Sequence, residues 1–496
     1  MRFLLENELL IPEHLSDKPG VKRISDHESG HSQPLNPSYD YSPELQQLLY
    51  GKQLLLEEIP FSLEDIQQHY VNGFVHYRKC ITKTKEGYSC VRCGNSDQKL
   101  FALFECARCQ QECTYCRKCI NMGRMSECTV MVSWAGPSPT GEIPAKPLVW
   151  EGSLSAGQQK ASTELIRAVQ TNDQLLIWAV CGAGKTEILF EGIETALQAG
   201  KRVCIATPRT DVVIELAPRI KAAFPQVDVI ALYGGSEDRN KTAPITLSTT
   251  HQLLRFYKAF DMIIIDEVDA FPYSVEPMLQ YAVNQAKKDI SSTIYLTATP
   301  NKTWKKEISA GKRKAVTIPA RYHRQPLPVP EYVWCGNWEK RLKKKRLPGN
   351  LMAWIKEHLE KGKQAFLFVP RITYLESIVQ VLQSIEPRIQ GVHAEAPDRK
   401  EKVARFRTGE IPIIVTTTIL ERGVTVPNID VAVLGAEDRI FTESALVQIS
   451  GRVGRSAQFP TGQILFFHFG RTMEMVKAKQ HIEKMNKEAL QNGFID

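Results

Sequence analysis

The stretch QLLIWAVCGAGKTEILFEGIETALQ (residues 174–198) decides the fold class of this 496-residue chain. It opens with an apolar run suited to a buried strand, and a helical pattern begins at Lys185. The glycines between them allow backbone N–H groups to close around phosphate oxygens at a helix N-terminus, whose dipole favours an anion. A strand, a glycine-rich turn and a helix in this order predict a nucleotide-binding α/β domain.

The expected cofactors are ATP and Mg²⁺, because the turn carries a lysine and a threonine at its end. The Lys185 amine would reach the β- and γ-phosphates, and the Thr186 hydroxyl would bind Mg²⁺. The first glycine of the general phosphate-loop pattern is absent, since Ala179 stands there. The residues expected to surround the nucleotide phosphates are Cys181, Gly182, Ala183, Gly184, Lys185 and Thr186.

An acidic motif, Asp266-Glu267-Val268-Asp269, follows the apolar run MIII and lies 81 residues after Lys185. ATP hydrolysis needs one carboxylate at the end of a strand to hold Mg²⁺ and a second to activate the attacking water. We assign Asp266 to the metal and Glu267 to the general base. Acidic residues after a strand are more often caps or solvated turns, but the preceding phosphate loop favours the catalytic interpretation.

Short apolar runs alternate with amphipathic helical patterns from residue 150 to the end of the chain. Runs such as RVCIA (202–206), ITLST (245–249) and DVAVLGA (430–436) suit parallel strands covered on both faces. A Pro- and Arg-rich segment (319–330) interrupts the alternation. The sequence therefore predicts two consecutive α/β domains.

Four motifs occur in the order known from the helicases and translocases of superfamily two, which this sequence resembles. They are AxxGxGKT (179–186), DExD (266–269), TAT (297–299) and QxxGRxGR (448–455). The resemblance implies two RecA-like parallel-sheet domains in tandem. It also implies an ATP site that is completed when the second domain closes on the first.

The same resemblance assigns roles to residues outside the phosphate loop. Gln448, Arg452 and Arg455 match the arginine-finger motif. Gln158 resembles the upstream glutamine that contacts adenine in related enzymes, although Gln159 is adjacent and a glutamine before a helix is common.

Nucleic-acid contacts are implied at the tops of both sheets. Hydroxyls, backbone N–H groups and an arginine can hold phosphates without reading sequence. Each threonine alone is more simply explained as a helix cap or a strand-end hydroxyl, but their order between the ATP motifs favours a nucleic-acid path. The matching residues are Thr207, Pro208, Arg209 and Thr250 in the first domain, and Thr417 and Gly423 in the second.

Composition and charge exclude several classes of protein. Hydrophobic residues make up 43% of the chain, as in soluble globular proteins, and no apolar stretch approaches the ~20 residues of a membrane-spanning helix. The first residues do not resemble a signal peptide, because Glu6 and Glu8 interrupt their apolar stretch.

The net charge is +8, and between residues 302 and 346 Lys and Arg outnumber acids by 14 to three. This block could follow a polyanion or form a solvated loop.

Nine of the twelve cysteines lie between Cys80 and Cys128. Without an export signal, such clustering indicates metal binding more than disulfides. Two Cys-x2-Cys pairs 22 residues apart predict a zinc-ribbon-like site made of Cys90, Cys93, Cys116 and Cys119. A second site that draws on Cys106, Cys109, Cys113 and Cys128 remains a less favoured alternative.

The expected organisation of the chain has six parts. A flexible tail (1–45) precedes a helical segment with the four-cysteine module (46–134) and a linker (135–149). The first RecA-like, ATP-binding domain (150–320), a basic linker (321–349) and the second RecA-like domain (350–496) follow.

A closer resemblance is to the ComFA family of late-competence ATPases of transformable Gram-positive bacteria. It covers about four fifths of the chain, outside the first 45 residues, and the extra cysteines at 106, 109 and 113 depart from the family pattern. The stretches that carry it include LLIWAVCGAGKTE (175–187), CIATPRTDVV (204–213), IIIDEVDAFPYS (263–274), TTTILERGVTVP (416–427) and FTESALVQISGRVGR (441–455).

This resemblance implies a cytoplasmic ATPase, peripheral on the inner face of the cell membrane, that helps to pull single-stranded DNA through an uptake channel. The implied partners are single-stranded DNA, the membrane channel protein, ComFC, DprA and a second copy of the chain. The implied metal cofactors are Mg²⁺ and Zn²⁺. A replication-restart-type helicase and a DNA-binding scaffold with a weak ATPase remain as alternatives.

Overall fold

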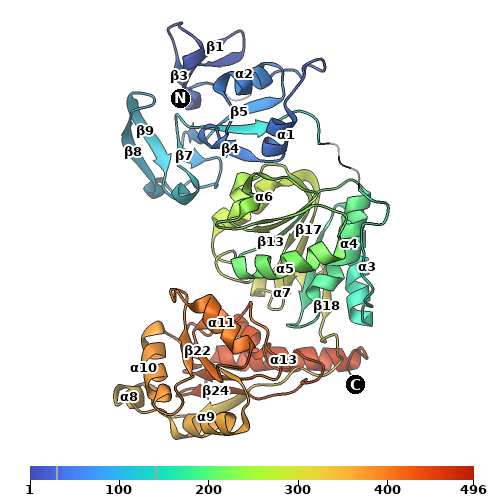
Figure 1. The fold of residues 1–496 in the computed structure, drawn as a ribbon, viewed down its shortest axis with the longest axis vertical. Helices are drawn as coiled ribbons and strands as arrows, with labels where there is room; N and C mark the ends of the chain where they lie inside the picture. Colours follow the sequence, from blue (N-terminus) through green and yellow to red (C-terminus); the bar gives the residue numbers. More distant parts are fainter. Residues whose placement is uncertain (29–31, 140, 142, 496) are drawn as a thin grey trace. The chain divides into compact units, whose positions relative to one another are not determined.

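The computed structural model describes residues 1–28, 32–139, 141 and 143–495. It confirms the expected fold class, with two parallel α/β sheets after an N-terminal region that is rich in strands (Figure 1). Contacts within the chain define two units. Unit 1 comprises Met1–Glu151, Ile166–Gln174 and Phe190–Tyr295, and unit 2 comprises Gly152–Leu165, Leu175–Leu189 and Leu296–Asp496.

The first residues form a small antiparallel sheet, so the expectation of a flexible tail is wrong for them. The order is β2-β1-β3, with β1 at Arg2–Glu6, β2 at Leu9–Pro12 and β3 at Lys22–Arg23. Phe3 is fully buried and its ring packs against that of Tyr77, 5.4 Å away. A core outside the segment therefore orders it, which its own polar composition does not reveal. Residues 29–31 of the expected tail lie outside the described residues.

The helical pattern after residue 42 yields two short helices, each begun by a serine. The Ser42 hydroxyl accepts from the Leu45 N–H at the start of α1 (Pro43–Leu49), and the Ser62 hydroxyl accepts from the Asp65 N–H at the start of α2 (Leu63–Val71). The rest of this region is strands. They are β4 (Gln53–Leu55), β5 (Val75–Lys79) and β11 (Val130–Trp134) in one sheet, β6 (Ile81–Thr84) with β7 (Gly87–Cys90), and β8 (Phe101–Cys106), β9 (Gln111–Cys116) and β10 (Met125–Ser126) in a third. The expected linker at 135–149 includes residues 140 and 142, which lie outside the described residues.

The first parallel sheet has the strand order β14-β15-β13-β16-β17-β12-β18. Its central strands are buried along their whole length, as expected for strands that helices cover on both faces. The strands are β12 (Gln174–Ala179), β13 (Val203–Thr207), β14 (Val229–Leu232), β15 (Ile245–Thr249), β16 (Phe260–Ile265), β17 (Lys287–Thr297) and β18 (Ala315–Ile318). The helices of this part are α3 (Ala156–Thr171), α4 (Lys185–Gln198), α5 (Thr210–Ala223), α6 (Pro277–Ala286) and α7 (Lys302–Ser309).

The second parallel sheet has the order β19-β24-β23-β20-β22-β21. Phe366 and Phe368 on β20 enter one hydrophobic cluster, while Ala365 and Leu367 enter another, so both faces of the strand are buried. The strands are β19 (Glu331–Trp334), β20 (Ala365–Phe368), β21 (Gln390–Val392), β22 (Ile413–Thr416), β23 (Asp430–Leu434) and β24 (Ile464–His468). The helices are α8 (Trp338–Lys343), α9 (Gly349–Lys361), α10 (Ile372–Gln383), α11 (Arg399–Arg407), α12 (Glu443–Ser450) and α13 (Met473–Gln491).

The segment expected as a basic linker (321–349) carries two of these elements. Its strand β19 pairs in parallel with β24, and Trp338 and Leu342 of α8 are buried in a core cluster. The basic run from Lys343 to Arg346 is exposed. The second sheet therefore begins inside the expected linker, because apolar residues between the charges are drawn into its core.

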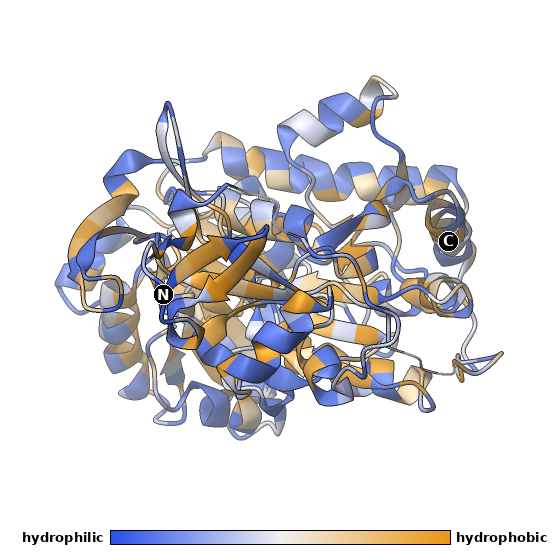
Figure 2. Ribbon diagram, turned by 90° about the horizontal axis from the view of Figure 1, so that it is seen from above, coloured by the Kyte–Doolittle hydropathy of each residue, from blue (hydrophilic) through white to orange (hydrophobic). Residues whose placement is uncertain are grey.

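Hydropathy follows this architecture. Figure 2 shows strands that are mainly hydrophobic and helices that combine hydrophilic and hydrophobic residues. Among the residues that the structure describes, no helix is both long and apolar enough to cross a membrane.

Candidate functional site

The phosphate loop connects β12 to α4 in unit 2. Gly182 and Gly184 have φ angles of +83° and +70°, a region that residues with a side chain rarely adopt. A Cβ atom at Gly184 would also lie 2.3 Å from Nε2 of Gln158. Conformation and space therefore both require glycine at this position.

Gln158, in the first turn of α3, is joined to this loop. Its side chain is buried, and its Nε2 donates to the Ala183 carbonyl at 2.9 Å. Its Oε1 accepts from the Ser155 N–H at 2.8 Å, so the amide is held at both ends. The structure brings Gln158 and the phosphate loop together, while Gln159 hydrogen-bonds through its backbone to Ser155.

The arginine-finger motif lies against the same loop, within unit 2. The Cys181 thiol donates to Oε1 of Gln448, 3.0 Å away and 267 positions later in the chain. Packing is equally close at Gly451, where an added Cβ would lie 2.5 Å from that of Cys181. The absence of a side chain at Gly451 therefore allows the backbone of the motif to approach the phosphate loop closely.

The two arginines of the motif have different surroundings. Arg452 is 2% exposed, and its guanidinium donates to the carbonyls of Glu421 (3.0 Å) and Val424. Arg455 is partly exposed, and it donates to the Gly451 carbonyl at 2.8 Å and to the Thr425 hydroxyl at 3.1 Å.

Arg321 is a residue of this site that sequence reasoning missed. Its guanidinium donates to the Cys181 carbonyl at 3.1 Å, to the Gly451 carbonyl at 3.4 Å and to the Gly454 carbonyl. Burial, together with the positive charge of Arg455, lowers the pKa of Arg321 to about 10, so it remains a cation near neutral pH. The single signal in the sequence is an arginine shortly after a strand, which is too common to single it out.

The acidic motif follows β16 in unit 1. The Asp266 N–H donates to the Ala206 carbonyl at 2.8 Å, and Oδ1 of Asp266 accepts from the Glu267 N–H at 2.8 Å. Glu267 has a φ angle of +56°, which is uncommon for a residue with a side chain and clusters at functional sites. These two hydrogen bonds thus hold the backbone of the turn in a conformation of unfavourable energy.

The expected nucleic-acid residues of the first domain gather at the ends of two neighbouring strands. The Thr250 N–H donates to the Thr207 carbonyl at 2.9 Å, after β15 and β13 respectively. Both threonine side chains are almost fully buried, and so is Pro208. Arg209 is more accessible and lies 3.9 Å from a carboxylate oxygen of Asp211.

In the second domain, Thr417 follows β22, and Gly423 has a φ angle of +76°. The Gly423 carbonyl accepts a hydrogen bond from Arg407 at 3.4 Å. These two residues occupy the turn between β22 and β23, near the carbonyls that Arg452 holds.

Cys90, Cys93, Cys116 and Cys119 form a buried cluster of the size that zinc requires. The sulfur atoms of Cys90 and Cys119 are 3.8 Å apart, and those of Cys93 and Cys116 are 3.7 Å apart. Four thiolates at about 2.3 Å from a tetrahedral zinc ion are about 3.8 Å from one another. Hydrogen bonds from the other three cysteines lower the pKa of Cys119 far below that of an ordinary thiol. These residues fit a zinc ion.

Arg92 balances the negative charge of this cluster. Its side chain is 3% exposed and donates to the Cys119 sulfur at 3.3 Å and to the Cys119 carbonyl at 2.8 Å. A zinc ion with four thiolates carries a net charge of about −2, so a buried guanidinium stabilises it.

Loops of the cluster contact α6, which follows the acidic motif. Lys118 pairs with Glu276 at 2.7 Å, and the Tyr281 hydroxyl donates to the Val91 carbonyl at 3.0 Å. The N-terminal region is thereby fastened to the α/β part of unit 1.

A second set of four cysteines, Cys106, Cys109, Cys113 and Cys128, also brings its sulfur atoms within 4.8 Å of one another. The structure therefore brings together the four cysteines of the less favoured site as well as the four of the favoured site.

Three protein-family models match this chain. They describe a competence protein ComFA N-terminal domain (residues 33–133), the res subunit of type III restriction enzymes (151–302) and a helicase conserved C-terminal domain (347–457). Among curated relatives, "Competence protein ComFA" of Bacillus subtilis (strain 168) is 50% identical over 92% of this chain and 98% of its own length. "Competence protein ComFA" of Streptococcus pneumoniae (strain ATCC BAA-255 / R6) is 40% identical over 76% of this chain and 86% of its own.

Among solved structures, a variant of S. cerevisiae Dbp5 bound to RNA and ADP BeF3 matches with a TM-score of 0.50 and 13% identity. The match covers 67% of this chain and 92% of that one. At this identity the likeness concerns the fold alone.

Proposed function

The chain belongs to the ComFA family of competence proteins, and from this premise we propose that it is an ATP-driven translocase that moves single-stranded DNA during uptake of transforming DNA. Its helicase domains imply ATPase activity. The main support for the proposal is the set of hydrogen bonds that link the phosphate loop to the arginine-finger motif. These bonds involve Cys181, Gln448 and Arg321. A nucleotide bound at this loop would act directly on the second domain.

Hydrolysis would use residues at the ends of parallel strands. Lys185 would hold the β- and γ-phosphates, while Thr186 and Asp266 would hold Mg²⁺, which neutralises charge on the phosphates. Glu267 would take a proton from the attacking water. In each unit these residues follow a parallel strand: β12 leads into the phosphate loop of unit 2, and β16 leads into the acidic motif of unit 1.

Coupling to motion would come from the arginine-finger motif. Gln448 and Gly451 touch the loop that would hold the nucleotide, and Arg455 follows them in the chain with a partly exposed side chain. A guanidinium at the γ-phosphate stabilises the charge of the transition state. Binding and loss of that phosphate would therefore close and open the domains.

The grip on DNA would be independent of sequence. The Thr207-Pro208-Arg209 turn and Thr250 share one sheet edge, and Thr417 and Gly423 occupy a turn of the second domain. Because the threonine hydroxyls of the first domain are buried and the Thr250 N–H is bonded to the Thr207 carbonyl, the Arg209 side chain is the group we assign to DNA phosphates there.

Zinc at Cys90, Cys93, Cys116 and Cys119 would be structural. The four thiolates leave no open position for a substrate, and such sites hold together regions too small to fold alone.

The proposal also includes a location and partners, which rest on the family. The location is the inner face of the cell membrane, and the partners are ComFC, DprA, the channel protein and a second copy of the chain.

Steady-state ATP hydrolysis with different polymers tests the proposal. We expect strong stimulation by single-stranded DNA and little by duplex DNA, because the assigned contacts follow one strand. Little stimulation by RNA is expected from the proposed role in DNA uptake. The Lys185→Ala variant should abolish the stimulated rate. Equal stimulation by duplex DNA would favour a restart-type helicase, equal stimulation by RNA would favour an RNA motor, and no hydrolysis with any polymer would contradict the assignment.

A further inference from the structure

We propose that Cys106, Cys109, Cys113 and Cys128 bind a second zinc ion, and that this ion fastens the N-terminal sheet (β1, β2 and β3) to the β8–β9 ribbon. The site is independent of the first, because the two share no ligand. It does not depend on the proposed motor activity.

The four cysteines have the spacing of a metal site and not of a disulfide. The sulfur atoms of Cys106 and Cys128 are 3.5 Å apart, whereas a disulfide needs about 2.05 Å. All four sulfur atoms lie within 4.8 Å of one another, and all four residues are buried. This geometry resembles that of the first cluster, where the corresponding sulfur distances are 3.7 and 3.8 Å.

The turn at Cys106-x2-Cys109 repeats the turn of the first cluster. In the first cluster the Gly94 N–H donates to the Cys90 carbonyl at 2.8 Å, and Gly94 has a φ angle of +69°. In the second, the Gln110 N–H donates to the Cys106 carbonyl at 2.8 Å, and Gln110 has a φ angle of +54°. A glutamine adopts this conformation at a cost, which a metal–thiolate centre formed by the turn would offset.

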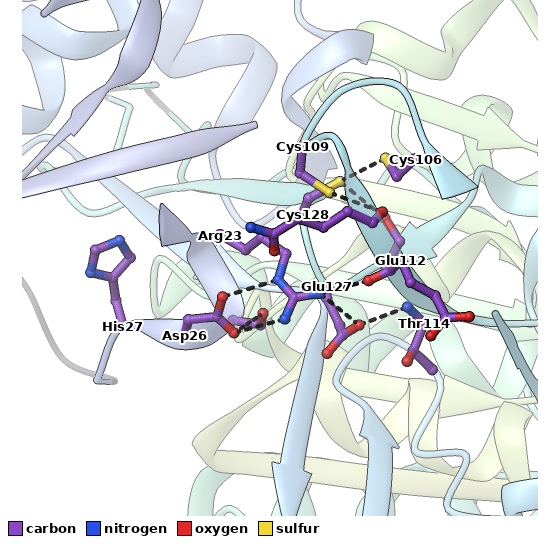
Figure 3. Close-up of polar contacts among 12 residues, drawn as sticks. Arg23, Asp26, His27, Cys106, Cys109, Glu112, Thr114, Glu127 and Cys128 are labelled. Carbon is purple, nitrogen blue, oxygen red and sulfur yellow. Dashed lines mark hydrogen bonds and ion pairs between the residues drawn. The ribbon is translucent and has the colours of Figure 1, made fainter. Parts of the chain in front are cut away.

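The N-terminal segment contacts the residues next to two of the four cysteines (Figure 3). Arg23 donates to the Glu112 carbonyl at 3.0 Å, next to Cys113, and pairs with the Glu127 carboxylate at 3.2 Å, next to Cys128. The Glu127 carboxylate also accepts from the Thr114 N–H at 2.6 Å. One arginine from β3 thus links both sides of the cluster.

Two backbone bonds complete the attachment. The backbone nitrogen of Met1 donates to the Cys128 carbonyl at 2.6 Å, and the Ser25 N–H donates to the Glu127 carbonyl at 3.2 Å. The match to the ComFA N-terminal domain model begins at residue 33, after this sheet. The sheet is therefore an addition to the matched region, and the second cluster lies where the sheet is held.

Zinc analysis of the wild-type chain and two variants tests the proposal. The full-length protein should hold two zinc ions per chain, and Cys106→Ser/Cys109→Ser should hold one. In that variant, amide hydrogen exchange in residues 2–12 should become faster, while exchange in β12 and β20 stays unchanged. Cys335→Ser, which changes a buried cysteine outside both clusters, is the matched control and should keep two zinc ions.

A second measurement covers the case in which the double variant does not fold. Metal-free wild-type chain titrated with Co²⁺ should gain thiolate-to-metal absorbance up to two equivalents, and residues 2–12 should gain protection from exchange over the same titration. One zinc ion or one cobalt equivalent per wild-type chain, iron in place of the second zinc, or unchanged exchange in residues 2–12 would overturn the proposal.

Discussion

Replacement of Arg455 with alanine should lower the DNA-stimulated turnover number for ATP hydrolysis by about 10³-fold or more, as expected for loss of an arginine finger. The chain should stay folded, because Arg455 is partly exposed and its partners are the Gly451 carbonyl and the Thr425 hydroxyl. The turnover number at saturating ATP and DNA, with a thermal unfolding curve, checks both statements.

Arg452→Ala is the informative comparison. Arg452 is 2% exposed and donates to the carbonyls of Glu421 and Val424, so its removal should leave buried acceptors unpaired. We expect this variant to lose activity and also about 1–3 kcal/mol of unfolding free energy. A near-wild-type turnover number for Arg455→Ala would contradict its role as the finger.

The Glu267→Gln variant should separate ATP binding from ATP hydrolysis. An amide has nearly the same shape as a carboxylate but does not accept the proton of the attacking water, so the rate should fall by about 10²–10⁴-fold. The backbone should be preserved, since the unusual φ angle of +56° and the hydrogen bond to Asp266 involve the main chain. Single-turnover hydrolysis and equilibrium binding of a fluorescent ATP analogue measure the two effects.

Asp266→Asn serves as the control for this experiment. It should weaken Mg²⁺-dependent nucleotide binding as well as hydrolysis, because Asp266 is assigned to the metal. If Glu267→Gln bound nucleotide as poorly as Asp266→Asn, or hydrolysed ATP at the wild-type rate, the assignment of Glu267 as the base would be wrong.

The sequence predicted the central strands of both sheets and missed three of their four edge strands. Runs such as 202–206 and 430–436 are apolar throughout because helices bury both of their faces, and the structure confirms them as β13 and β23. The strands that were missed, β18, β19 and β21, each lie at an edge of a sheet and are only partly buried. Partial burial removes the continuous apolar pattern on which the prediction depended.

The residues of the candidate site were also only partly predictable from the sequence. Local motifs located Lys185, Asp266, Gln448 and the first four cysteines, since each motif is a short pattern with its own chemistry. Arg321 stayed hidden because its three carbonyl partners come from two distant segments, and an arginine alone carries no pattern. Cys128 was named only in the less favoured second set, since it belongs to no Cys-x2-Cys pair and strand pairing brings it to cysteines that lie far from it in sequence.

Translocation along single-stranded DNA is the most direct measurement. Streptavidin bound to biotin at either end of a single-stranded oligonucleotide should be displaced from one end only, in the presence of ATP and Mg²⁺. Lys185→Ala should displace none, because it lacks the lysine assigned to the β- and γ-phosphates. ATP hydrolysis that is stimulated by single-stranded DNA without displacement from either end would contradict the account, since the protein would then hydrolyse ATP without moving along its strand.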